Sequence, residues 1–259
     1  MAIFNLNCRK FDKYISTPIK KKVNISSIKE RFGRFKPIGL DELYRFFKES
    51  EPDLLKSTFN WRVFELVKQF ELKRIGRGQL MIGQEVSFSQ QYTEQLNEIG
   101  SYIQDQFPFA DYCLWDTGIL NEFAHHLQRH SFIIVDVEKD TAQSVYFQLK
   151  ERFKPAFFRV NVNLVFDFAD DDNKPLLIRN MVSESPVSQG SIKTPTLEKI
   201  LVDVFSDPEF LYLEGSEMRL IFLNAFEKYT INRTKLYRYA ARKGKKHDLM
   251  EYIDNILKP

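Results

Sequence analysis

The chain has 259 residues, of which 43% are hydrophobic and 28% are charged, and its net charge is +3. This composition is ordinary for a globular protein, and no apolar run reaches the roughly 18 residues that a transmembrane helix needs. The N-terminus has no secretory signal, and Cys8 and Cys113 are too few for a disulfide framework. We therefore expect a soluble, cytoplasmic protein.

The first segment, residues 1–24, is a basic leader. Residues 1–36 contain ten lysines and arginines and two acidic residues, a net charge of +8, so the remainder carries −5. A basic segment beside an acidic body is typical of nucleic-acid contact. A solvated tail would explain the same count, and the sequence leaves both interpretations open.

Residues 25–82 show the pattern of several short elements around a small core. Apolar side chains at helical spacing, such as Leu43, Phe46 and Phe47, predict a helix with one buried face. The predicted elements are a helix over 25–33, an extended piece over 35–38, a helix over 41–50, and a third helix that Ser57 or Thr58 caps and that ends near Phe70.

A β-hairpin is predicted directly after the third helix. Two runs that contain apolar residues, 72–75 and 80–82, flank the turn residues Gly76 and Gly78. The order helix, strand, helix, helix and hairpin is that of a winged helix-turn-helix domain. In such domains the third helix enters the major groove of DNA, and we expect the hairpin to lie along the DNA backbone.

The rest of the chain predicts a second, larger unit. Residues 83–105 read as a polar connecting helix, and residues 106–259 contain strands and helices followed by a helical C-terminal tail. The strongest strand is FIIVDVEKD, and a clear amphipathic helix is TAQSVYFQLKERF. The predicted fold class is therefore α/β (α+β), with a winged helix-turn-helix at the N-terminus.

Cationic and polar side chains collect on the third helix and the hairpin. Cations there would attract phosphates and fix the position of the protein on DNA, and polar residues near the helix start could reach base edges. The module could dock a protein instead, and Trp61 is better explained by packing under a neighbouring segment. The candidate DNA-binding residues are Thr58, Asn60, Arg62, Lys68, Lys73, Arg74 and Arg77.

Three carboxylates near the predicted strands allow an enzymatic alternative. Asp116, Asp136 and Glu138 could form a restriction-nuclease-like site that binds Mg²⁺. Such a site also needs an acid-x-Lys triplet, and Glu138 occupies the position of that lysine. We therefore expect no catalytic residues, and we find no nucleotide-binding or catalytic-triad motif.

A histidine cluster could suggest a metal site. His126 and His130 are four residues apart, beside His125, and a helix would place the pair on one face. The cluster falls where a helix should end, however, and no second pair of ligands follows. We therefore interpret these histidines as surface or capping residues and expect no metal and no cofactor.

A second basic cluster, with interleaved tyrosines, lies near the C-terminus. A solvated helix face is the default explanation, but the cluster could also bind nucleic acid or an acidic partner. Because it concentrates positive charge in an otherwise acidic body, we expect a partner-binding surface here. The candidate residues are Arg238, Arg242 and Lys243.

The stretch EPDLLKSTFNWRVFELVKQFELKRIGRGQL resembles the winged-helix head of AbiEi-type antitoxins from bacterial type IV toxin–antitoxin systems. So do PFADYCLWDTGILNEF, the strand FIIVDVEKD, and the tail LEKILVDVF … INRTKLYRYAARKG, in the same order. The resemblance covers most of residues 25–253 and does not include the leader.

This resemblance implies a transcriptional repressor that binds double-stranded DNA of its own promoter and carries a C-terminal antitoxin domain. The implied functional partner is a nucleotidyltransferase-like toxin, opposed with or without direct contact. The resemblance transfers no catalytic motif. It assigns DNA contacts to Thr58, Asn60, Arg62, Arg74 and Arg77.

Overall fold

A computed structural model describes residues 25–33, 35–128, 131–169, 174–188, 190–213 and 215–257. These residues form a mixed α/β protein, as the sequence predicted, and its strands make a three-stranded and a four-stranded sheet. We call residues 25–82 the head and residues 94–257 the body. The predicted leader lies outside the described residues. In the described part of the chain, no helix is both long and apolar enough to span a membrane.

The head contains three helices and a small antiparallel sheet with the strand order β1-β3-β2. Its apolar side chains, among them Ile28, Leu43 and Phe59, form one core of their own. The predicted order of elements is confirmed. The elements are α1 (Ile25–Phe32), β1 (Ile38–Gly39), α2 (Leu40–Ser50), α3 (Lys56–Lys68), β2 (Leu72–Gly76) and β3 (Gln79–Ile82).

The β2–β3 hairpin lies between the head core and the body. Leu72 and Ile82, which pair across the hairpin, belong to the head core. Lys73 and Met81 form the next pair, so they point to the opposite face, and both are buried as well. Strand β2 contacts α9 (Arg233–Arg242) of the body. The hairpin is therefore covered on both faces along this part of its length.

The turn of the hairpin approaches α9 closely. The backbone N–H of Arg77 donates to Thr234 Oγ1 at 3.3 Å. A Cβ atom at Gly76 would meet the same hydroxyl at 2.6 Å, so any other residue there would require Thr234 to shift. The body occupies the α9 side of the hairpin, so the predicted contact with the DNA backbone would have to use its other side.

The predicted connecting helix over 83–105 is shorter than expected and belongs to the body. Residues 83–93 have no regular structure, and α4 (Glu94–Gln106) begins after Thr93, whose side chain accepts a hydrogen bond from the N–H of Leu96. Leu96, Ile99 and Ile103 of α4 pack into the core on one face of the four-stranded sheet. A helix that contributes three apolar side chains to the core of the body is part of its fold.

The four-stranded sheet has the order β4-β5-β7-β6, with β4 antiparallel to β5 and the other neighbours parallel. Alternating side chains point to opposite faces, so each strand contributes to two cores. Helices α4 and α5 cover one face, and the C-terminal helices cover the other. The elements of this part are β4 (Tyr112–Asp116), η1 (Thr117–Glu122), β5 (Ile133–Val137), α5 (Ala142–Arg152), β6 (Ala156–Phe158), α6 (Val162–Phe166) and β7 (Leu176–Asn180).

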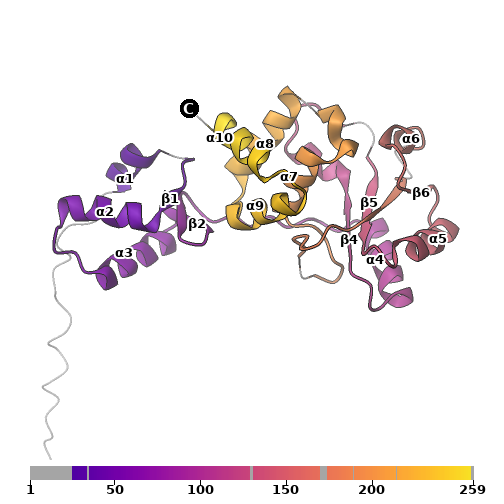
Figure 1. The fold of residues 1–259 in the computed structure, drawn as a ribbon, viewed down its shortest axis with the longest axis horizontal. Helices are drawn as coiled ribbons and strands as arrows, with labels where there is room; N and C mark the ends of the chain where they lie inside the picture. The colour runs from indigo at the N-terminus through magenta and orange to yellow at the C-terminus, as the bar shows by residue number, and fades with distance from the viewer. Residues whose placement is uncertain are drawn as a thin grey trace, which may run out of the picture.

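The helical tail lies in the middle of the molecule and is not peripheral. Figure 1 shows α7 to α10 between the head and the four-stranded sheet. Their apolar side chains, together with Trp115, Ile134 and Leu177 of the sheet, form a large core. The elements are α7 (Leu197–Ser206), η2 (Pro208–Leu213), α8 (Ser216–Lys228), α9 and α10 (Lys246–Ile256).

Candidate functional site

The outer face of α3 carries several of the predicted DNA-binding residues. Asn60 and Lys68 are exposed on it, and Lys56, which sequence reasoning did not select, is exposed at its first position. Arg74 and Arg77 are exposed on the neighbouring hairpin, while Thr58 is half-buried. We call Lys56, Asn60, Lys68, Arg74 and Arg77 the α3 surface.

The N-terminus of α3 is arranged differently from the prediction. The helix begins at Lys56 with Leu55 as its N-cap, and among the described residues no side chain caps it, so Ser57 and Thr58 are not capping residues. Its first turn contains no acidic residue. Unsatisfied backbone N–H groups and the positive end of the helix dipole favour an anion at such a position.

A hollow of about 410 Å³ lies beside this helix end. Lys56 and Asn60 of α3 line it together with Arg45 of α2 and Gly78 of the hairpin turn. Asp41 and Glu42 also contribute to its wall. The hollow therefore gathers two cations and an amide at the start of α3, although acidic residues lie on its α2 side.

Two of the predicted DNA-binding residues do not lie on the exposed surface of the head. Arg62 donates to Glu51 Oε2 at 2.7 Å, and its side chain is only 17% exposed, so it fastens α3 to the end of α2 instead of reaching outward. Lys73 is 6% exposed, on the hairpin face that the body covers.

Large apolar side chains are also exposed on α3. Trp61 and Phe64 are 58% and 56% exposed, and Phe70, just after the helix, is exposed as well. The expectation that Trp61 packs under a neighbouring segment is not met by the described residues. Exposed aromatic side chains beside cations can stack on nucleic-acid bases or form a protein contact.

The C-terminal basic residues fall into two different environments. Arg238 and Arg242 are exposed and both pair with Glu184, Arg238 at 3.5 Å. Lys243 was predicted on the same surface, but its side chain is 10% exposed and its Nζ lies 2.7 Å from Asp203 Oδ1. The prediction for Lys243 is wrong, because the end of α9 directs this lysine into the body.

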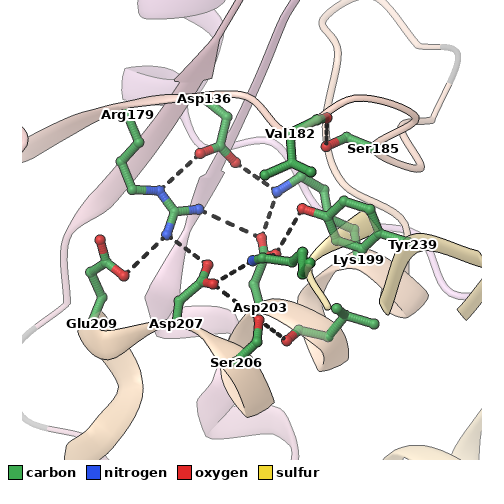
Figure 2. Close-up of polar contacts among 12 residues, drawn as sticks. Asp136, Arg179, Val182, Ser185, Lys199, Asp203, Ser206, Asp207, Glu209 and Tyr239 are labelled. Carbon is green, nitrogen blue, oxygen red and sulfur yellow. Dashed lines mark hydrogen bonds and ion pairs between the residues drawn. The ribbon is translucent and has the colours of Figure 1, made fainter. Parts of the chain in front are cut away.

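Lys243 belongs to a buried charge network of the body (Figure 2). It begins with a row across the sheet, where Asp136 of β5 pairs in register with Cys113 of β4 and Arg179 of β7. All three side chains point to the face that the C-terminal helices cover. Arg179 Nε donates to Asp136 Oδ1 at 2.8 Å.

Helix α7 supplies the opposite side of the network. Lys199 Nζ lies 2.6 Å from Asp136 Oδ2 and 2.5 Å from Asp203 Oδ2, which is four residues further along the same helix. Lys199 and Asp203 are 1% and 0% exposed. Tyr239 of α9 donates to Asp203 Oδ1 at 2.9 Å. The network thus joins the sheet, α7 and α9.

The network ends at the surface beside η2. Arg179 reaches Asp207 at 3.0 Å and Glu209 at 3.4 Å, and Lys243 also pairs with Asp207. Four carboxylates, of Asp136, Asp203, Asp207 and Glu209, thus surround three cations, of Arg179, Lys199 and Lys243. A buried charge is tolerated only when it is paired and hydrogen-bonded, and here each one is.

The pairing holds these groups in their charged forms. Burial opposes ionisation of Asp136, but Arg179 and Lys199 outweigh it and lower the pKa of Asp136. Burial likewise opposes ionisation of Asp203, whose pKa Lys199, Lys243 and Arg179 together lower. A general acid or base needs a pKa near the working pH, so these shifts favour a structural role for the network.

The carboxylates considered for a nuclease-like site do not converge. Asp116 accepts the N–H of Gly118 at 2.8 Å and pairs with Lys174. Asp116 lies opposite Ile133 in the sheet. Ile133 is three residues before Asp136 on the same strand, so the side chains of Asp116 and Asp136 point to opposite faces of the sheet. Glu138 lies after β5, where it accepts a hydrogen bond from Thr141 before α5. The alternative based on these three residues has no geometric support.

The described histidines do not form a metal site. The rings of His125 and His126 lie 4.8 Å apart, and their backbone N–H groups both donate to Glu217 Oε1. His130 lies outside the described residues. Across the described ranges, no group of three or more His, Cys, Asp and Glu side chains is placed to hold a metal ion.

Sequence reasoning overlooked most of the charge network, although one signal was present. Lys199 and Asp203 are charged residues at i and i+4 on the buried helix LEKILVDVF, whose other side chains are mostly apolar. Charges on a helix that is apolar all round must find partners inside the protein. Arg179 is likewise a charged residue in a mostly apolar element, the strand LLIRN.

The comparisons with known proteins concern most of the chain. Residues 58–259 match a family described as a family of unknown function, DUF6577. The match starts within α3 and therefore includes the hairpin and the body but not α1, β1 and α2. No curated protein matches the chain.

Proposed function

We propose that this chain, which belongs to the DUF6577 family, is a DNA-binding transcriptional regulator whose head contacts duplex DNA through the α3 surface. The observation that carries the proposal is the start of α3. There an uncapped helix end, free of acidic residues in its first turn, carries exposed Lys56 and Asn60. The order of the head elements supports the proposal, because it is the order of winged helix-turn-helix domains.

The position of the hairpin defines how such a contact would be made. Because α9 covers one side of the hairpin, the proposed approach to DNA uses α3 together with the exposed Arg74 and Arg77. Helix α3 would enter the major groove, and the two arginines would contact phosphates at its edge. Lys68, at the far end of α3, would contact phosphate on the other side of the groove.

The proposal predicts salt-dependent binding to duplex DNA. The purified full-length chain should shift a fragment of its own promoter, and affinity should fall steeply between low and moderate salt, because each neutralised phosphate releases counterions. Fluorescence anisotropy at several salt concentrations measures this directly. Absence of binding even at low salt would refute the proposal.

We also propose, on the resemblance to AbiEi-type antitoxins, that the chain opposes a nucleotidyltransferase-like toxin. The exposed pair Arg238 and Arg242 on α9 is the proposed partner surface, now without Lys243. Co-expression with the cognate toxin should protect cells. Arg238→Glu/Arg242→Glu protein should protect less, and equal protection by this variant would remove the surface assignment while leaving antitoxin activity intact.

A protein-docking function is the second candidate. The exposed Trp61 and Phe64 favour it, since aromatic side chains are common at protein interfaces. The two candidates differ in which substitutions matter. If Trp61→Ala/Phe64→Ala protein no longer protects cells from the toxin but keeps its DNA affinity, the result would favour docking of a protein.

A further inference from the structure

A hollow of about 1000 Å³ lies between the head and the body. Its head wall contains Phe32, Phe35 and Pro37, and its body wall contains Leu223 of α8 with Ile256 and Leu257 at the end of α10. Small-molecule sites have about this size, are mostly apolar and often lie between domains. Apolar walls of this extent gain free energy when a ligand displaces water from them.

One charged residue in the wall of this hollow lacks a full set of partners. Arg233, the first residue of α9, is 4% exposed, and its Nε atom is buried without a hydrogen-bond partner among the described residues. Its Nη2 donates to the carbonyl oxygen of Phe35 at 3.5 Å, and its guanidinium lies 5.4 Å from the ring centre of Phe226. A buried polar atom without a partner is unusual and costs stability.

The charge around the hollow is positive. None of the ion pairs within the described residues involves Arg233, so no carboxylate there lies within 4.0 Å of its guanidinium. Burial lowers the pKa of Arg233, and Tyr237 and Asp254 offset this only in part. Lys36 and Arg219 also line the hollow, where Asp254 is the one acidic lining residue among those described.

We propose that this hollow binds a small organic anion with an apolar body, such as a medium-chain carboxylate, whose acid group pairs with Arg233. An arginine side chain donates charge-assisted hydrogen bonds to a carboxylate. The apolar body would lie against Phe32, Leu223 and Ile256. Because both walls contact the ligand, binding would hold the head against the body.

The test uses the full-length chain and two probes. The anionic dye 1-anilinonaphthalene-8-sulfonate should bind saturably with enhanced fluorescence, and octanoate should displace it far better than octanol, which lacks the charge. Arg233→Met should lower the affinities for both the dye and octanoate by at least about 10-fold, the usual effect of losing a charge-assisted hydrogen bond. Arg242→Met, which removes an exposed arginine of the same helix, is the matched control and should leave both affinities unchanged.

A second variant separates loss of binding from loss of the fold. Leu223→Trp keeps Arg233 and fills part of the hollow, so it should also reduce dye binding, while circular dichroism and thermal unfolding report whether each variant is folded. Equal competition by octanol and octanoate would overturn the proposal. So would dye binding that neither Arg233→Met nor Leu223→Trp changes, or the absence of saturable binding. None of these readouts requires DNA, so the outcome is independent of the proposed regulatory function.

Discussion

Replacing Lys199 by methionine should lower the free energy of unfolding by about 3–5 kcal/mol, the usual cost of removing one partner from a buried ion pair. Methionine preserves most of the volume of lysine, so the loss reports charge and not packing. Asp136 and Asp203 would keep Arg179 and Lys243 as partners but would lose their closest shared cation. Chemical denaturation of both proteins measures the difference.

Two further variants make this prediction specific. Lys228→Met removes an exposed cation that pairs with Glu122, and it should change stability far less, because surface ion pairs contribute little. The double variant Lys199→Met/Asp203→Asn removes cation and anion together, so its destabilisation should be smaller than the sum of the two single effects. Additive losses would contradict a direct interaction between the two side chains.

The same network predicts how stability depends on pH. The pKa values of Asp136 and Asp203 are lowered from the ordinary value of 3.8. Their contribution is therefore fully present above about pH 4 and is lost as the pH falls below that value toward the pKa values of the folded state. Below about pH 4, the free energy of unfolding should fall more steeply with decreasing pH for the natural protein than for Lys199→Met protein, because the carboxylates of the variant gain less from ionisation. Chemical denaturation at several acidic pH values measures this dependence.

Reversing three cations of the α3 surface should reduce affinity for duplex DNA by about 100-fold or more at low salt. A cation close to a phosphate gains about 1 kcal/mol in water, and reversal turns this attraction into repulsion. The variant Lys56→Glu/Lys68→Glu/Arg74→Glu changes exposed side chains only, so the fold should persist. Anisotropy titration of one DNA fragment with both proteins gives the ratio of affinities.

The matched control reverses three exposed cations of the body. Lys139→Glu/Lys150→Glu/Lys246→Glu produces the same change in net charge, but these side chains lie on the body. If the α3 surface binds DNA, the control should retain most of the affinity. Equal losses in both variants would mean that net charge governs binding, and the assignment of the surface would fail.

Local patterns predicted the elements of the head well. The spacing of Leu43, Phe46 and Phe47 identified α2, and the glycines at 76 and 78 located the hairpin turn. Such signals depend on neighbours in the sequence. The start of α3 was misplaced, because Ser57 and Thr58 are good capping residues and yet the helix begins before them, at Lys56.

The arrangement of the head on the body could not be predicted in this way. The hairpin touches Thr234, more than 150 residues later in the chain, and no local pattern encodes that contact. The predicted surface position of Lys243 was incorrect for a similar reason. It lies in a basic run that suggests a solvated surface, whereas its partner Asp203 comes from a different helix. Only the packing of α7 against α9 brings them together.

Site-specific photo-cross-linking from α3 tests the central claim most directly. The variant Asn60→p-benzoylphenylalanine places the photoreactive group on the exposed face at the start of α3, and Gln143→p-benzoylphenylalanine places it on exposed α5 of the body. With the promoter fragment bound, illumination should link position 60 to DNA and leave position 143 unlinked. Full DNA affinity in both variants, with no cross-link at position 60 or with equal cross-links at both, would contradict recognition through α3.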